Sequence, residues 1–303
     1  MSQNLENSTT TTSPWPPVTP STFPTLLDLV AMAGIFFVVQ LLVGGVGMLV
    51  LAIMGQPITN LAPATLGSYM AWVSGISMTL TLALLILYRR LRRGEAVKIH
   101  FAVGRFNLLL VVWSFVLMMS LGVVMEPLYN LLPSFDQQFG EGFGTFLAVV
   151  VFAPLFEEII CRGLVYGSLL RRHSKWMSML LSALFFGVLH VQPVPMINAV
   201  LMGLVLAFVY DRCQTIWAPI MLHALNNGVA FVMMQLGYGE TTMSQLLEGH
   251  PVWYAILYGL SLVVAVGSVW GMVRSLKQQT EVPMEVPTTP EVEPAEQKIE
   301  GEA

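Results

Sequence analysis

Long apolar segments recur along this chain, and they restrict it to a fold that spans a membrane. A helix needs about 20 apolar residues to cross a bilayer core about 30 Å thick. Apolar runs on this scale lie near 27–55, 67–88, 107–132, 142–171, 175–192, 195–212, 215–236 and 252–276, of which the fifth and sixth are short and separated only by a turn over 191–195. The sequence therefore predicts an all-α polytopic membrane protein, a bundle of about eight transmembrane helices.

Composition agrees with that fold and excludes several classes of protein. With 55% hydrophobic and 11% charged residues, the chain is too apolar for a water-soluble enzyme. A net charge of −4 offers no broad basic surface for nucleic acid, so we expect no nucleic-acid partner. Its two cysteines, Cys161 and Cys213, are too few for a disulfide framework or a four-cysteine zinc site.

Basic residues occur only in every second connection between the apolar runs, and this predicts the orientation. Lys and Arg near the ends of spans stay on the cytoplasmic side. The basic residues outside the spans are Arg89, Arg90, Arg92, Arg93, Lys98, Arg105, Arg171, Arg172, Lys175, Arg212, Arg274, Lys277 and Lys298. The other connections carry acidic residues only. We therefore expect both termini to be cytoplasmic, although the cluster over 89–93 is also suited to docking lipid headgroups or a protein.

Both ends of the chain have the composition of disordered tails. Residues 1–25 are rich in Ser, Thr and Pro, and they lack the basic start and the cleavage site of a signal peptide. Residues 277–303 are acidic and contain several prolines. The predicted organisation is a cytoplasmic tail over 1–25, a transmembrane bundle over 26–276 and an acidic cytoplasmic tail over 277–303.

Three charged residues stand in the middle of the fourth apolar run, namely Glu157, Glu158 and Arg162. An Asp, Lys or Arg at the centre of a spanning helix costs roughly 2.5–3.5 kcal/mol on insertion scales, so such residues persist mainly where they pair or work. Glu158 and Arg162 are four residues apart with the acid first, and we expect them to pair on one helix face. Glu157 then points away from this pair and toward another helix.

Two other runs carry polar side chains at a comparable depth. His190 lies near the end of the fifth run, and His223 and Asn227 share one face of the seventh. At 1.5 Å per residue, these groups and Glu157 lie about 13 to 22 Å from the cytoplasmic ends of their helices. A carboxylate and an imidazole can deprotonate a water, while imidazole and amide N–H groups stabilise the oxyanion that forms. The set suits hydrolysis, but transporters use the same residue types.

The order of these motifs resembles that of a known family. The pattern EExxxR at 157–162, FxxxH at 186–190 and HxxxN at 223–227 is similar to the three motifs of the CPBP family. This family comprises type II CAAX prenyl endopeptidases together with bacteriocin-processing, immunity and abortive-infection-like proteins. The resemblance implies an intramembrane glutamate-type endopeptidase whose catalytic core covers about 142–236.

The resemblance also implies roles for the residues at the motif positions. Glu157 with His190 would activate water, His223 with Asn227 would form the oxyanion hole, and Glu158 and Arg162 would support them. The substrate would be a membrane-associated peptide or protein, lipidated or not, and the location the plasma (inner) membrane of a bacterium, with membrane lipids as further partners. The mechanism requires no cofactor.

Three alternatives remain open on the sequence alone. Glu157, His190 and His223 are a possible zinc set with one position free. Cys161 follows Glu157 by one turn and would be a thiol nucleophile if a histidine activated it. A non-catalytic immunity-type scaffold or a small-solute transporter would use the same polar residues for binding or for helix contacts.

Small residues and one further acid complete the expectations. The spacing of Gly163 and Gly167 predicts the close approach of another helix. The glycines over 140–144 predict a flexible loop at the start of the fourth span, with a hinge for a substrate gate as the alternative. Glu126, near the outer end of the third span, is expected at the membrane interface.

Overall fold

A computed structural model describes residues 23–103, 105–133, 140–239 and 241–281 of the chain. Within these residues the regular secondary structure is helical throughout, which confirms the predicted all-α class. The elements in chain order are α1 (Leu26–Ile53), η1 (Ile58–Asn60), α2 (Pro63–Leu91), α3 (Leu108–Tyr129), α4 (Gly142–Phe146), η2 (Leu147–Phe152), α5 (Ala153–Glu158), η3 (Ile159–Tyr166), α6 (Gly167–Leu169), α7 (Lys175–Val188), α8 (Pro193–Cys213), α9 (Trp217–Gln235), α10 (Met243–Leu246) and α11 (Pro251–Glu281).

Elements α4 to α6 follow one another without a break and form one long helix, Gly142–Leu169, called the segmented helix below. Six helices in the described residues are long and apolar enough to cross a membrane: α1, α2, α3, the segmented helix, α8 and α11. Helix α7 has 14 residues and is shorter, and α9, which contains a histidine and two adjacent asparagines, is not among the six. A helix occupies each predicted run, and the chain is a multi-pass integral membrane protein.

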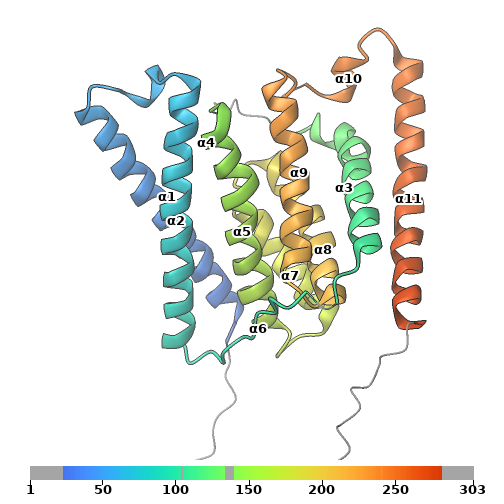
Figure 1. Ribbon diagram of the computed structural model, residues 1–303, viewed down its shortest axis with the longest axis horizontal. Helices are drawn as coiled ribbons and strands as arrows, with labels where there is room; N and C mark the ends of the chain where they lie inside the picture. Colours follow the sequence, from blue (N-terminus) through green and yellow to red (C-terminus); the bar gives the residue numbers. More distant parts are fainter. Residues whose placement is uncertain (1–22, 104, 134–139, 240, 282–303) are drawn as a thin grey trace, which may run out of the picture.

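The helices stand side by side, with α1 and α2 at one edge of the bundle and α11 at the other (Figure 1). Helix α1 packs against α2, α2 against α4, α7 against α8, and α3 against α11. Helix α9 contacts η2 and α5 of the segmented helix and also contacts α3 and α8. The segmented helix and α9 therefore lie at the centre of the fold.

The connections alternate between the two ends of the bundle as the charge pattern predicts. The α2–α3 and α6–α7 connections lie at the end where α1 begins and α11 ends (Figure 1). The α8–α9 connection lies there as well, because Ile216 N donates to His100 O of the α2–α3 connection at 2.8 Å. All the basic connections in the described residues thus share one end, while η1, α10 and the start of α4 lie at the other (Figure 1). That the basic end is cytoplasmic stays a prediction.

The described chain extends slightly beyond the predicted bundle at both ends. Phe23 is buried, and Thr25 caps α1 by accepting from Asp28 N at 3.1 Å, so these residues belong to the bundle rather than to a tail. Helix α11 continues to Glu281, past the predicted end at 276. The remainder of the two predicted tails, 1–22 and 282–303, lies outside the described residues.

The glycines at the start of the segmented helix form a packing contact and not a flexible loop. A Cβ atom at Gly140 or Gly144 would collide with the backbone of Gly67 in α2. Conversely, a Cβ at Gly67 would collide with Glu141 O and with Thr145 Oγ1. The expectation of a loose segment over 140–144 was wrong because the glycines let two backbones touch, a use that spacing alone does not reveal.

Candidate active site

Two π-helical stretches flank the acidic pair of the segmented helix. Element η2 precedes α5, which ends with Glu157 and Glu158, and η3 follows it. A π-helical turn is wider than an α-helical turn, and such turns inside α-helices are frequent at functional sites. The pair therefore lies on a short α-helical turn between two irregular ones.

Each π-helical stretch offers a backbone carbonyl to a neighbouring helix. Asn227 Nδ2 of α9 donates to Val149 O of η2 at 2.8 Å. Ser182 Oγ of α7 donates to Cys161 O of η3 at 2.8 Å. Side-chain donors inserted at irregular helical turns fix their geometry. These bonds tie the acidic segment to the helices that carry His223 and His190.

Glu158 is the centre of a buried polar cluster. Its Oε1 accepts from Arg162 Nη1 at 2.9 Å and contacts His223 Nδ1 at 2.9 Å. The side chains of Glu158 and Arg162 are fully buried, and that of His223 is 3% exposed. The predicted pairing of Glu158 with Arg162 is therefore confirmed, and His223 joins it from α9. The two partners offset the desolvation cost of a carboxylate at this depth.

Arg162 reaches beyond Glu158 to two other helices. Its Nη2 donates to Gly203 O of α8 at 2.9 Å, and its guanidinium carbon lies 4.8 Å from the ring centroid of Phe186 in α7. A guanidinium has donors in a fixed fork and stacks on aromatic rings, so one side chain holds three elements in register. This is the structural role predicted for Arg162.

Glu157 faces the other side of the same histidine. Its Oε2 lies 3.9 Å from His223 Nε2, and its side chain is 13% exposed, whereas that of Glu158 is fully buried. The prediction that Glu157 points to another helix is thus confirmed. A separation of 3.9 Å exceeds a direct hydrogen bond, so the two side chains are neighbours without bonding each other directly.

His190 lies just after the end of α7 and is oriented by its own helix. Its Nδ1 lies 3.0 Å from Phe186 O. A carbonyl only accepts, so Nδ1 carries the proton and donates, which leaves Nε2 as an acceptor in the neutral ring. The Phe186 ring meets the His190 and His223 rings edge-on, with centroids at 4.8 Å and 5.5 Å. Phe186 therefore lies between the two imidazoles.

Asn227 is held by two contacts on α9 and η2. One N–H of its amide is used by Val149 O, and its Oδ1 accepts from Asn226 Nδ2 at 3.3 Å. An amide nitrogen has two N–H groups, so one is left for a ligand. The predicted oxyanion role of Asn227 therefore rests on a single remaining donor.

A part of the α2–α3 connection without regular secondary structure, residues 94–103, packs against the segmented helix and is called the crossing segment below; residue 104 lies outside the described residues. A Cβ at Gly163 would lie 2.8 Å from Ile99 Cδ1, and a Cβ at Gly167 would collide with Val97. The two glycines do allow a close approach, as predicted. The expectation that a helix makes that approach was wrong, because the partner is a non-helical segment whose Val97 and Ile99 side chains lie against the two glycines.

The structure bears on two of the alternatives, the thiol nucleophile and the metal site. Cys161 is fully buried and its thiol is surrounded by the apolar core, so it is poorly placed to reach a substrate. Across the described parts of the chain, no three His, Cys, Asp or Glu side chains are grouped so that they could hold a metal ion. Whether activity depends on zinc at Glu157, His190 and His223 is a matter for experiment.

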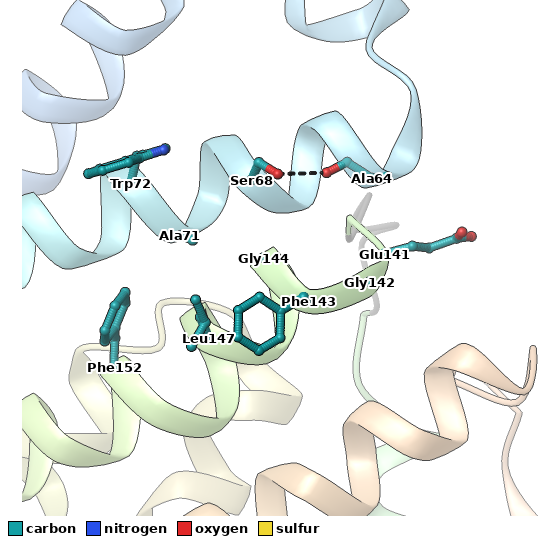
Figure 2. Close-up of a pocket in the computed structure, with 10 residues that line it drawn as sticks. All are labelled: Ala64, Ser68, Ala71, Trp72, Glu141, Gly142, Phe143, Gly144, Leu147 and Phe152. Carbon is teal, nitrogen blue, oxygen red and sulfur yellow. Dashed lines mark hydrogen bonds between the residues drawn. The ribbon is translucent and has the colours of Figure 1, made fainter.

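An apolar pocket lies near the start of the segmented helix, away from the acidic pair. It is bounded by α2 and α4, with Trp72, Phe143, Leu147 and Phe152 around it and Glu141 at its rim (Figure 2). Ser68 turns its hydroxyl back to Ala64 O at 3.1 Å (Figure 2). None of the predicted site residues lines this pocket.

Sequence reasoning found four of the residues that contact one another here and missed the groups that hold them. Glu157, Glu158, Arg162 and His223 form one connected cluster. The bracing role of Phe186 had a signal, because this residue belongs to the FxxxH pattern. The carbonyl groups that anchor Arg162 and Asn227 had none, since any residue supplies a carbonyl.

Comparison with known proteins locates a family match on this region. Residues 140–229 match the family model described as "Type II CAAX prenyl endopeptidase Rce1-like". A segment of 105 residues is 33% identical to the Bacillus subtilis (strain 168) protein named "Putative membrane peptidase YdiL", covering 33% of this chain and 43% of that protein. No solved structure matches this chain. The matches support a membrane protease.

Proposed function

We propose that the chain is an intramembrane endopeptidase of the glutamate type, because residues 140–229 match the Rce1-like family model and carry the three motifs that resemble the CPBP family. It would hydrolyse a peptide bond of a membrane-associated protein or peptide, with or without a lipid attached. The observation that supports this best is the approach of Glu157 to His223 at 3.9 Å, next to the buried ion pair of Glu158 and Arg162.

The proposed base is Glu157. It is the more accessible of the two glutamates, and its free oxygen faces the space next to His223 Nε2. A water held there by Glu157, with the acceptor Nε2 of His190 as its second partner, loses a proton to the carboxylate as it attacks the peptide carbonyl. Glu157 then returns this proton to the leaving nitrogen as the C–N bond of the tetrahedral intermediate breaks. Glu158 is held by Arg162 and His223 and does not enter the reaction.

The proposed oxyanion donors are His223 and Asn227. With Nδ1 bound to the Glu158 carboxylate, a protonated His223 donates from Nε2 toward the developing negative charge, and the second N–H of Asn227 adds to it. Removal of one such donor typically costs about 100- to 1000-fold in rate. No step of this mechanism requires a metal ion.

The test is a comparison of peptide termini by mass spectrometry. Membranes of cells that contain the unmodified protein are compared with membranes that contain Glu157→Gln at equal abundance. The matched control is Glu141→Gln, because Glu141 is an exposed carboxylate at the start of the same helix. Termini that depend on Glu157 and not on Glu141 support the peptidase. Identical profiles in all three samples contradict it and favour a binding scaffold.

The location belongs to the same proposal. We place the protein in the plasma membrane of a bacterium with both termini in the cytoplasm, because the basic connections share one end of the bundle with the described chain ends (Figure 1). A cysteine-labelling reagent that does not cross membranes should reach an engineered cysteine in η1 from outside and one in the crossing segment only after lysis.

A further inference from the structure

A pocket with several polar side chains in its lining lies beside α9, and Asn226, next to Asn227 of the candidate active site, is one of them. This cavity has a volume of about 410 Å³ and lies between α3, α8, α9 and the start of α10. Its polar lining comes from Glu126, Tyr129, Asn198 and Asn226 together with Thr241 and Thr242. Its walls also include the thioethers of three methionines, Met118, Met119 and Met243. Methionine walls adapt to ligands of varied shape.

Glu126 is a buried carboxyl group without a basic side chain beside it in the described residues. Its side chain is only 5% exposed, and Met243 N and Ser244 N donate to its two oxygens at 3.1 Å and 2.7 Å. Glu126, which was expected near the outer membrane interface, is thus enclosed by protein. In the described residues no Lys or Arg lies within ion-pair distance of it. The sequence explains this, because 106–161 and 213–273 contain no basic residue other than histidine.

A carboxyl group that lines a pocket and has no basic neighbour offers acceptor positions to a cation. Buried charges in proteins are normally paired, because desolvation is costly. Two backbone N–H groups satisfy two of the roughly four acceptor positions of a carboxylate, so others are left for an additional donor. Lysine and arginine side chains place apolar stems along apolar walls and a charged head at an acid, which matches methionine walls with Glu126 at one side.

The cavity and the candidate active site share one helix. Asn226 lines the cavity, and its Nδ2 donates to Asn227 Oδ1, a member of the proposed oxyanion hole. On an α-helix Asn226 lies about 60° around the axis and about 4.5 Å along it from His223. An extended peptide advances about 3.3 Å per residue, so residues close to a bond held at His223 reach the cavity.

We propose that this cavity is the subsite that receives a lysine or arginine side chain of the peptide substrate, with Glu126 as its counter-ion. The role as a substrate subsite rests on the proposed peptidase function, whereas binding of the basic group does not require cleavage. The same ammonium chemistry occurs in phosphatidylethanolamine, and the experiment separates the two sources. The link through Asn226 to Asn227 favours the peptide.

The test measures binding without cleavage. The full chain carrying Glu157→Gln is reconstituted in vesicles of phosphatidylcholine and phosphatidylglycerol. The probes are fluorescent apolar decapeptides with one lysine at each position in turn, and each has a counterpart with norleucine. We expect the lysine peptide to bind about 10-fold more tightly at one or two positions, as a charge-assisted hydrogen bond provides.

Two variants remove the preference in different ways. Glu126→Gln removes the charge, and Gly122→Leu fills the cavity, since Gly122 lines it and a Cβ there meets no atom within 4 Å. Both should abolish the lysine preference. The matched control is Gly259→Leu in α11, where a Cβ also meets no atom within 4 Å, and it should keep the preference. Should Gly122→Leu fail to fold, Gly122→Ala serves in its place with a partial loss.

Three results would overturn the proposal. The first is equal binding of lysine and norleucine peptides at every position. The second is a lysine preference that survives both Glu126→Gln and Gly122→Leu. The third is loss of lysine binding when phosphatidylethanolamine is added to the vesicles, which would assign the site to a lipid. A lysine preference that depends on Glu126, in a protein that produces no new termini, would keep the cation site and reject the peptidase.

Discussion

The segmented helix and α11 are both long enough to cross the membrane, yet their surroundings differ. The segmented helix holds a buried ion pair, two π-helical stretches and glycines in contact with the crossing segment. Helix α11 is regular, packs mainly against α3, and leaves Leu260, Val263 and Val266 more than half exposed. The first helix is defined by specific neighbours, whereas the second needs only to be apolar on its outward face. Substitutions in the two should therefore have very different effects.

The largest expected effect is on catalysis at Glu157. Glu157→Gln keeps the shape and removes the base, so we expect cleavage of any identified substrate to fall by at least about 1000-fold. Purified protein in detergent should unfold at nearly the same temperature, since Glu157 forms no ion pair as close as that of Glu158. An equal fall in activity and thermal stability would show that Glu157 is structural instead.

The next effect is on stability at Arg162. Arg162→Met leaves Glu158 buried without its cation, and breaking such a pair costs about 3–5 kcal/mol. Thermal unfolding in detergent measures the loss. The double variant Glu158→Gln with Arg162→Met should recover part of it, because the uncompensated charge is gone. The comparison between the helices would break if Arg162→Met cost no more than an exposed substitution in α11.

A smaller effect is expected where the crossing segment meets the segmented helix. Gly167→Ala would place a methyl group against Val97, and overpacking of this kind costs about 1–3 kcal/mol. Adding Val97→Ala should restore stability. In α11, Gly259→Ala meets no neighbouring atom and should be neutral or stabilise by up to about 1 kcal/mol, as alanine favours helix. If both substitutions changed the stability in the same direction, the expected difference between the segmented helix and α11 would be contradicted.

The smallest expected effect is that of a chelator. The proposed chemistry uses carboxylate, imidazole and amide groups only, so incubation with EDTA or 1,10-phenanthroline should leave cleavage unchanged. A loss that added zinc restores would assign Glu157, His190 and His223 to a metal site. In that case Glu157 of the segmented helix would be a metal ligand and not the general base.

Several features of the fold and site followed directly from spacing. A run of about 20 apolar residues has one stable form in a bilayer, so the helices were predictable. The pair of Glu158 and Arg162 was predictable too, since a four-residue separation brings two side chains together on one helix face. Glu157, by contrast, had no partner on its own helix, so it was expected to point to another helix. In the structure it approaches His223.

Other features depend on tertiary contacts that sequence patterns do not encode. Backbone carbonyl groups of the π-helical stretches around α5 accept hydrogen bonds from Asn227 and Ser182, which lie on other helices. Glu126 was expected near the membrane interface because it is close to a helix end, and no pattern revealed that the start of α10 folds back onto it. Glycine spacing predicted a close contact at Gly163, while the identity of the partner, a non-helical connecting segment, was not predictable.

The hydrogen bonds of the crossing segment also imply an order in which parts of the chain pack together during biosynthesis. Its His100 O and Phe101 O accept from Ile216 N and from Trp217 Nε1, at 2.8 Å and 3.0 Å, across more than a hundred residues of chain. The segment leaves the ribosome before α9 exists, so it waits unpaired while the intervening helices enter the membrane. Only when α9 arrives do these bonds form. The helix that carries His223 is thus fixed late, and a nascent chain stalled before it would contain the glutamates without their histidine.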